Sequence, residues 1–317
     1  MMLSRVADSL YWMSRYLERA EHVARILEVQ MNLMLDRGSV TVEGRWNRVL
    51  KCLGNPVVGE GFRDPYHLAH RLAFDAENRS SILSSISAAR ENARQVREQI
   101  SSEMWEQVNR MFHEARRASA GDILVDEPFD FLRAIREGSH LFQGITDSTM
   151  SHEQGWQFIQ IGRALERAIS VTALVDTYYT DLEWNRAEVV SDPLEWIGLL
   201  KSATAFEAYC KKHGAEPRLD WIAEFLVLDA EFPHSIRFSA DQIAYAVESI
   251  GDHSRRASQL LRLTGKMRAQ LGFSQIEEIM HSGINGYLKN IERQCLEVDL
   301  TLRDAYIGYS IEEALGA

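Results

Sequence analysis

The feature that most constrains the fold is a helical period of apolar residues that continues over very long stretches. In residues 3–36, apolar side chains recur at spacings of three and four, the period of one face of an α-helix. Only 6 prolines occur among 317 residues, so few positions interrupt such helices. We therefore expect an all-α protein.

The same period predicts about ten helices in a large multi-helix bundle. Asp192-Pro193 is typical of an N-cap followed by proline at the first helical position, and it begins one of them. The only candidate strand is a weak one at residues 40–43. The expected helices are 3–36, 46–53, 66–74, one continuous helix over 81–115, 128–149, 152–182, about 20 residues from Pro193, 218–229, a helix with its stripe over 243–271, and 284–305.

Composition and charge exclude several classes of function. The formal net charge of −11 predicts no nucleic acid partner and no binding to anionic membranes. The 3 cysteines lie far apart and match no disulfide or zinc pattern. The N-terminus lacks the apolar core of a secretion signal, and no apolar run approaches the roughly 18 residues of a transmembrane helix. We expect a soluble, cytoplasmic protein.

Two hexapeptides, residues 15–20 and 163–168, match at five of six positions. The second lies in a stretch, residues 158–175, whose only charged residues are Arg163, Glu166 and Arg167. A helix that is apolar on every side is a buried helix, so we expect these charges inside the protein. The simplest geometry packs the two motif helices together around an Arg/Glu cluster. We expect one domain over residues 1–317. The match between the hexapeptides is also compatible with a domain made of two repeated halves, 1–150 and 151–317.

Buried ions need a reason, and two interpretations remain open. The cluster is either a layer of ion pairs that fixes helix register or a site in which arginines hold a carboxylate or phosphate. In the site interpretation the glutamates orient the arginines or transfer a proton. Polar residues on the helix that begins near residue 81 would add further contacts to the bound molecule. The candidate catalytic residues are Glu18 and Glu166, and the candidate substrate-binding residues are Arg15, Arg19, Arg163, Arg167, Arg90, Asn92 and Arg94.

These segments resemble the Alpha-E family, also called DUF403, an all-helical domain named for its Glu-Arg motif. The resemblance rests on residues 14–21, Asn78 with residues 89–94, residues 161–168, and the string Phe232-Pro233-His234-Ser235-Ile236, and it extends over essentially the whole chain.

The resemblance implies a function within a larger system. It implies association with circularly permuted ATP-grasp amide ligases and with transglutaminase-like peptidases, and a part in making or modifying a small peptide or amide-linked metabolite. The sequence has no phosphate-binding loop of its own, so we expect no cofactor here and ATP, if used, on a partner. The alternative is a non-catalytic helical adaptor that docks the ligase. The long apolar stripes are also compatible with a homodimer.

A third interpretation, a ferritin-like metalloprotein, rests on two Glu-x-x-His strings at residues 137–140 and 278–281. Two such strings are about as many as chance produces in a chain with this many glutamates and histidines. We therefore expect no metal ligands.

Overall fold

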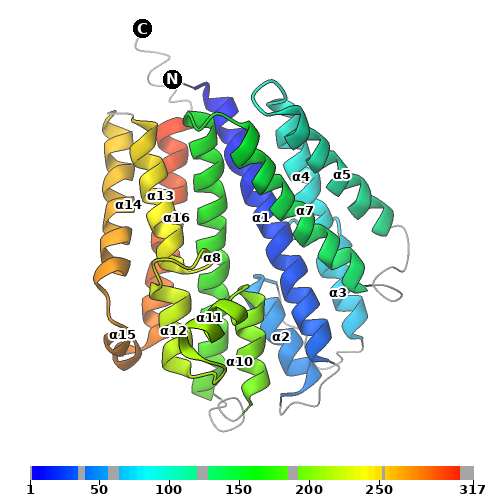
Figure 1. Cartoon of the computed structure of the whole chain (residues 1–317), viewed down its shortest axis with the longest axis vertical. Coiled ribbons are helices and arrows are strands. Elements are labelled where there is room, and N and C mark those ends of the chain that lie inside the picture. Colours follow the sequence, from blue (N-terminus) through cyan, green and yellow to red (C-terminus); the bar gives the residue numbers. More distant parts are fainter. Residues whose placement is uncertain are drawn as a thin grey trace.

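The computed structural model describes residues 2–34, 40–55, 64–119, 128–184, 192–251 and 254–307. Within these ranges the chain forms fourteen α-helices and no strand, which confirms the all-α prediction (Figure 1). The two longest helices carry the two motif segments. They are α1 (Ser4–Leu33) and α8 (Gln154–Trp184).

The remaining helices are shorter and are capped mainly by serine and aspartate side chains. They are α2 (Val42–Cys52), α3 (Pro65–Phe74), α4 (Ile82–Gln95), α5 (Ser102–Ala118), α7 (Pro128–Thr149), α10 (Pro193–Ser202), α11 (Phe206–His213), α12 (Leu219–Leu228), α13 (Ile236–Ile250), α14 (Arg255–Phe273), α15 (Ile276–Ser282) and α16 (Ile284–Tyr306).

Three predicted helices are each two helices in the structure. The expected helix over 81–115 turns between α4 and α5, where the Ser101 side chain accepts a hydrogen bond from the Met104 amide and starts α5. The helix from Pro193 ends before Thr204, which has a φ of 58°. The helix expected over 243–271 breaks at Gly251, a left-handed residue that ends α13. The apolar stripe continues across each break, so periodicity alone did not locate them.

Two further differences account for the rest. Helix α15 was not predicted, and together with the three breaks it raises ten helices to the fourteen observed in the described ranges. The candidate strand at 40–43 was wrong, because Thr41 caps α2 and Val42 begins it. The predicted proline start at Asp192-Pro193 is confirmed, since Asp192 accepts a hydrogen bond from the Leu194 amide.

The long helices form two four-helix rings side by side. In the first ring α1, α4, α5 and α7 pack in that cyclic order, and in the second α8, α13, α14 and α16 do the same. The rings meet where α1 packs along α8, which we call the seam (Figure 1). The first ring ends with α7 at Thr149 and the second begins with α8 at Gln154. The division into domains remains a prediction.

Helices α1 and α8 run parallel and very close together. The Met2 backbone amide donates to the Gln154 side chain at one end, and Gly162 of α8 lies against α1. A Cβ atom on Gly162 would lie 2.2 Å from the Ser14 hydroxyl oxygen and 2.4 Å from the Tyr11 carbonyl oxygen. Only glycine permits this approach. It brings the motif residues, one turn further along both helices, within reach of one another.

Candidate functional site

The two Glu-Arg dipeptides pair with each other across the seam. Arg19 Nε lies 2.6 Å from Glu166 Oε1, and Arg167 Nε lies 2.5 Å from Glu18 Oε1. Each glutamate of one motif therefore holds the arginine of the other. The two pairs lie on opposite sides of the seam, because Glu18 and Arg19 are successive residues and point about 100° apart around α1.

Glu166 is held by two arginines of α1. Arg15 Nε lies 2.7 Å from Glu166 Oε2, so both carboxylate oxygens are occupied by guanidinium groups. Burial opposes the ionisation of this carboxyl group, but the charges of Arg15 and Arg19 outweigh it and lower the pKa of Glu166. The Glu166 side chain is only 5% exposed, whereas that of Arg19 is 22% exposed. Glu166 is thus a fixed anion that orients Arg19.

Arg15 is supported from behind by α16. Its Nη1 donates to Asp299 Oδ1 at 2.7 Å and to the Tyr11 hydroxyl at 3.0 Å, and Tyr11 also donates to Asp299. Sequence reasoning missed Tyr11 and Asp299. Asp299 lies 284 positions from Arg15 in the sequence and nothing in its local pattern indicates the contact.

A cavity of about 260 Å³ opens beside Arg19, between α1, α2, α8 and α16. We call it the seam cavity. Charged, polar and apolar groups line it, from both motif helices and from the segments around them: Arg19, His22, Val23, Lys51, Cys52, Leu53, Gly54, Ser80, Glu166, Ile169, Ser170, Ala173 and Glu292. Its volume is just below the roughly 300–1,000 Å³ of sites for drug-sized ligands, so it suits a molecule the size of an amino acid.

Two cations face this space. The Nε of Arg19 is used by Glu166, but its two terminal nitrogens have no hydrogen-bond partner among the described residues. Lys51 is half exposed, and among the described residues it pairs with Asp181, 3.6 Å away. Arginine in this state is a planar donor ready for a carboxylate or phosphate.

His22 and Cys52 are neutral at this site. Burial is the main cause that lowers the pKa of His22, to about 4. Its Nε2 is buried and has no hydrogen-bond partner among the described residues. Burial likewise raises the pKa of the Cys52 thiol to about 12, so it carries no thiolate at neutral pH.

The second pair, Glu18 with Arg167, is closed over. Arg167 donates to Glu18 through both Nε and Nη2, and through Nη1 to the Pro233 carbonyl oxygen at 3.1 Å. Gln143 of α7 donates to Glu18 at 3.3 Å. We call the side of the seam with Glu18, Arg167 and Pro233 the closed face, and the side with Arg19, Glu166 and Ser80 the cavity face.

Beside the closed face, Glu21 of α1 is held by Arg25 and lies 3.7 Å from His140. Burial opposes ionisation of Glu21, yet the neighbouring His140 and the charge of Arg25 hold its pKa well below its usual range. Burial, followed by the charge of Arg167, lowers the pKa of His234 far below normal. Arg25 and Glu21 therefore form an ion pair beside the closed face.

Arg163 does not join either pair. It has no carboxylate within 4.0 Å among the described residues and donates to Gln160 of its own helix. Burial, then repulsion from Arg167, lowers its pKa. The hollow beside it holds only about 10 Å³, too little for a ligand.

The predicted residues on α4 lie outside the seam cavity. Arg90 donates to Asn109 of α5 at 2.6 Å and packs over the Phe112 ring. Asn92 donates to the carbonyl of its own helix, and Arg94 is an exposed partner of Glu91. These three residues therefore are not brought together with the motif arginines.

A second buried network was missed by sequence reasoning. Glu195 of α10 is completely buried and is held by Arg45 at 2.7 Å and by Arg48, both from α2. Arg48 also pairs with Asp181 at 2.8 Å. The available signal was Glu195 itself, a carboxylate in the apolar helix after Pro193.

A short repeat flanks the two faces and was also missed. Asp-Ala-Glu is followed after three residues by Ser-Ile at 75–82 and at 229–236. In both copies the aspartate accepts a hydrogen bond from the glutamate amide, and the serine, Ser81 or Ser235, caps the next helix. The first copy carries Ser80 to the cavity face, and the second carries Pro233 to the closed face.

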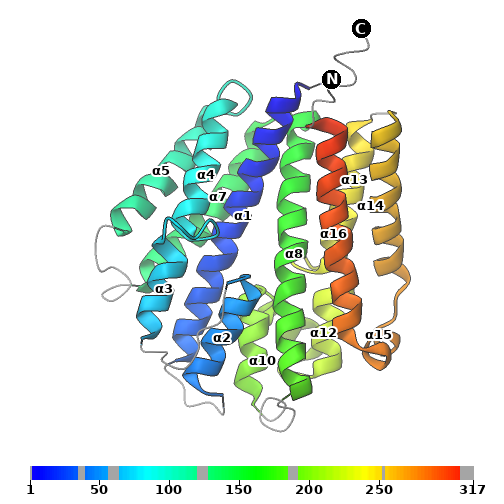
Figure 2. The same cartoon turned by 180° about the vertical axis from the view of Figure 1, so that it is seen from behind.

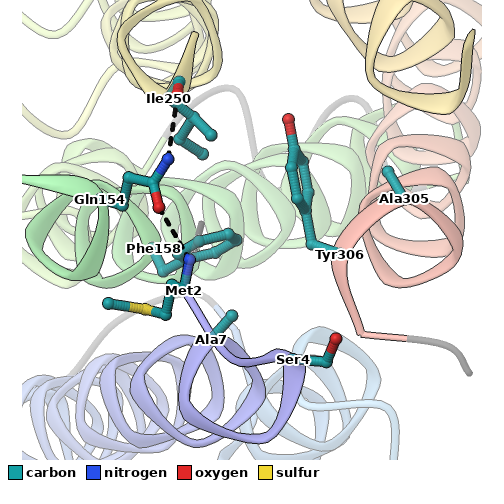
Figure 3. Close-up of a pocket in the computed structure, with 8 residues that line it drawn as sticks. All are labelled: Met2, Ser4, Ala7, Gln154, Phe158, Ile250, Ala305 and Tyr306. Carbon is teal, nitrogen blue, oxygen red and sulfur yellow. Dashed lines mark hydrogen bonds between the residues drawn. The ribbon is translucent and has the colours of Figure 1, made fainter. Parts of the chain in front are cut away.

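A small cavity at one end of the seam is a weaker candidate. A cavity of about 50 Å³ at the starts of α1 and α8 is spanned by Gln154, which joins the Met2 amide to the Ile250 carbonyl (Figure 3). It has room for a few water molecules. Across the described ranges, no three His, Cys, Asp or Glu side chains are grouped to hold a metal ion. No described helix has the length and apolar character to cross a membrane.

Comparisons with known proteins find distant relatives in Mycobacterium. Uncharacterized protein Mb2597 of Mycobacterium bovis is 22% identical over 320 residues, which cover 95% of this chain and 36% of the relative. Uncharacterized protein Rv2567 of Mycobacterium tuberculosis matches with the same identity and coverage. The chain thus spans about a third of the length of these curated relatives. The comparison with solved structures found no significant match.

Residues 2–307 match the sequence profile of Alpha-E, described as a predicted alpha-helical domain with a conserved ER motif. Of the three Glu-Arg dipeptides in the sequence, the two at 18–19 and 166–167 are those that pair across the seam. Because the match covers nearly the whole chain, the protein belongs to the Alpha-E family.

Proposed function

We propose that this protein binds a small carboxylate-bearing molecule in the seam cavity, as a component of an amide-forming or peptide-modifying system. One observation carries the proposal. Glu166 fixes the Nε edge of Arg19, the terminal nitrogens of Arg19 have no hydrogen-bond partner among the described residues, and Arg19 lines a cavity that also contains Lys51. A guanidinium group held in place by one carboxylate offers its other edge to a second at little further cost in side-chain entropy.

The glutamates act in this proposal by position. Glu166 and Glu18 are both engaged by arginines, and the lowered pKa of Glu166 keeps it ionised at neutral pH. An ionised, doubly paired carboxylate is a poor proton donor. We therefore assign Glu166 the role of orienting Arg19 and assign Glu18 the same role toward Arg167.

The wider system follows from the resemblance. It suggests a circularly permuted ATP-grasp ligase, and secondarily a transglutaminase-like peptidase, as partner, with ATP bound by the ligase. The greater length of the Mycobacterium relatives, of which this domain is about a third, supports a domain that works beside other polypeptide.

Isothermal titration with N-acetylglycine, a minimal carboxylate, tests the binding proposal. We expect saturable binding to the unmodified protein and a loss of about tenfold or more in Arg19→Gln, as expected when one charge-assisted contact is lost. Arg94→Gln is the matched control, because Arg94 is exposed and lies outside the seam cavity. Equal binding by Arg19→Gln, or no binding by the unmodified protein, would contradict the proposal.

A second candidate function, the non-catalytic adaptor, is favoured by the closed Glu18–Arg167 pair and by the pairing of buried Glu195 with two arginines. It is separated from the first by co-purification with an ATP-grasp ligase. An adaptor retains the ligase when Arg19 is replaced by glutamine and shows no carboxylate binding of its own.

A further inference from the structure

Helix α1 is buried along almost its whole length except for one narrow stripe. Between residues 9 and 27, the residues that are not buried are Trp12, Tyr16 and Arg19. Their spacing of four and three places them on one face of the helix, and Figure 2 shows α1 between α4 and α8 on this side of the molecule. The stripe therefore leads along α1 directly to the arginine at the mouth of the seam cavity.

The stripe is an organised aromatic surface. The Trp12 and Tyr16 rings stack with centroids 5.4 Å apart. The Arg15 guanidinium lies 4.7 Å from the Trp12 centroid, and that of Arg19 lies 5.4 Å from the Tyr16 centroid. Arginines fixed by Glu166 thus hold both rings in place from behind, and cation–π contacts of this kind favour a defined ring orientation.

Helix α16 adds an apolar group beside the stripe. Glu292 lines the seam cavity and Asp299 contacts Arg15, so this face of α16 points toward α1. Leu296 lies between them at helical spacing and is 52% exposed. An exposed leucine on the face of α16 that points toward α1, together with the partly buried Trp12 and Tyr16 rings of α1, supplies apolar groups near the cationic cavity.

We propose that the seam cavity and this stripe together bind an α-carboxylate that carries an apolar or aromatic side chain. The carboxylate lies on Arg19 and Lys51, and the side chain packs on Tyr16, Trp12 and Leu296. This inference rests on the proposed carboxylate binding and extends it to the chemical class of the ligand. Both a free amino acid and the C-terminus of a peptide present this chemistry.

Titrations with three compounds test the inference: N-acetylphenylalanine, N-acetylglycine and N-acetylphenylalaninamide, which lacks the carboxylate. We expect N-acetylphenylalanine to bind about tenfold more tightly than N-acetylglycine, since packing an aromatic ring on aromatic groups contributes on that scale. The amide should bind more weakly than either acid. Equal affinities for the two acids would overturn the inference and leave the proposed function standing, whereas no binding of either acid would overturn both.

Variants place the aromatic contact. Trp12→Ala is expected to bring the affinity ratio of the two acids close to one, while Tyr245→Ala, which removes an exposed aromatic ring of α13, keeps it. Circular dichroism and urea unfolding serve as controls that both variants fold. A ratio unchanged by Trp12→Ala, and by Tyr16→Ala if the first variant fails to fold, would contradict the inference.

Two further ligands identify the source of the carboxylate. Phenylalanine and Gly-Gly-Phe share the carboxylate and ring but differ in the group attached to the α-nitrogen. Tighter binding of Gly-Gly-Phe identifies a peptide C-terminus, and tighter binding of phenylalanine identifies a free amino acid. Failure of both to compete with N-acetylphenylalanine would overturn the assignment of the ligand class.

Discussion

The two faces of the seam carry the same pair of residues in different surroundings. On the closed face, Arg167 binds Glu18 and its remaining nitrogen is taken by the Pro233 carbonyl. On the cavity face, Arg19 binds Glu166 through Nε and lines the seam cavity, and its terminal nitrogens have no partner among the described residues. A Glu-Arg pair is therefore structural or available for binding according to what its neighbours do with the unused edge of the arginine.

One neighbour explains much of the difference. On the closed face, Gln143 of α7 donates a hydrogen bond to Glu18. On the cavity face, α16 contributes Glu292 to the same space as Glu166. A carboxylate cannot donate to another carboxylate, and like charges repel. The amide thus adds a hydrogen bond to its pair, whereas Glu292 makes no hydrogen bond to the cavity-face pair among the described residues.

The Glu195 network shows the fully closed extreme. Its carboxylate is completely buried between Arg45 and Arg48, and its role is to fix α2 against α10. The three glutamates thus form a series, from Glu195 through Glu18 to Glu166, in which every carboxylate is paired with arginine and access for a ligand increases.

The largest expected difference between the two faces is in the unfolding free energy lost when the glutamate of each pair is replaced by glutamine. Glu18→Gln leaves Arg167 buried without a carboxylate and should cost about 3–5 kcal/mol. Glu166→Gln should cost less, about 1–2 kcal/mol, because Arg15 keeps Asp299 and Arg19 reaches water in the cavity. Urea unfolding measures both values. Equal losses would break the distinction between the faces.

A substitution in the seam should disturb both faces together. Gly162→Ala places a Cβ 2.4 Å from the Tyr11 carbonyl oxygen, so α1 and α8 must separate. We expect a loss of about 3 kcal/mol, the upper end for overpacking, and weaker N-acetylglycine binding. Gly144→Ala in α7 is the matched control, since a Cβ there meets no atom within 4 Å. It should be neutral or slightly stabilising. A well-folded Gly162→Ala protein of normal stability would show that the close approach is unnecessary.

The pH dependence of stability should report on the cavity face through His22. The pKa of His22 falls from 6.5 to about 4 on folding, mainly because the side chain is buried. The charge of Arg25 also lowers it, and the charges of Glu21 and Glu166 raise it. The unfolded chain therefore takes up a proton first, and stability is complete above pH 6.5 and declines toward pH 4.

This linkage should remove about 2 kcal/mol by pH 4.5. His22→Gln should flatten the curve of unfolding free energy between pH 6.5 and 4.5, whereas His281→Gln, at an exposed histidine of α15, should not. A curve of unchanged slope in His22→Gln would refute the assignment.

The smallest effect concerns the neighbour that distinguishes the faces. On the closed face, the glutamine Gln143 lies beside the Glu-Arg pair, whereas on the cavity face the glutamate Glu292 does. The substitution Glu292→Gln gives the cavity face a glutamine as well. Because Glu292 is exposed, we expect a gain of only about 0.5 kcal/mol, measured by urea unfolding. A loss of the same size would mean that Glu292 does not oppose Glu166.

The seam could be predicted from the sequence because its signals are local. The repeated hexapeptides, and a helix whose only charges are Arg163, Glu166 and Arg167, place those charges between two packed helices. The structure confirms buried Glu18 and Glu166 and a largely apolar α8. Because both motifs carry Glu and Arg at the same positions, packing their helices side by side brings the glutamate of one close to the arginine of the other.

The remaining parts of the site depend on distant contacts. Lys51, Asp299 and Glu292 reach the motif helices from α2 and α16, and their own sequence surroundings are ordinary solvated helix. The breaks before Ser101 and at Gly251 interrupt helices whose apolar stripe continues, because both helices of each pair bury the same face. The spacing of apolar residues therefore does not reveal a point at which the chain changes direction, when the helices on both sides of that point bury the same stripe.

A crystal structure of the protein with 4-iodobenzoate tests the central claim most directly, because the iodine locates an apolar ring that carries a carboxylate. The account predicts an anomalous peak beside Tyr16 and Trp12, with the carboxylate on Arg19 and Lys51 and nothing at Arg167. A seam cavity that stays empty at saturating ligand, or a ligand bound at the Arg167 pair instead, would contradict it.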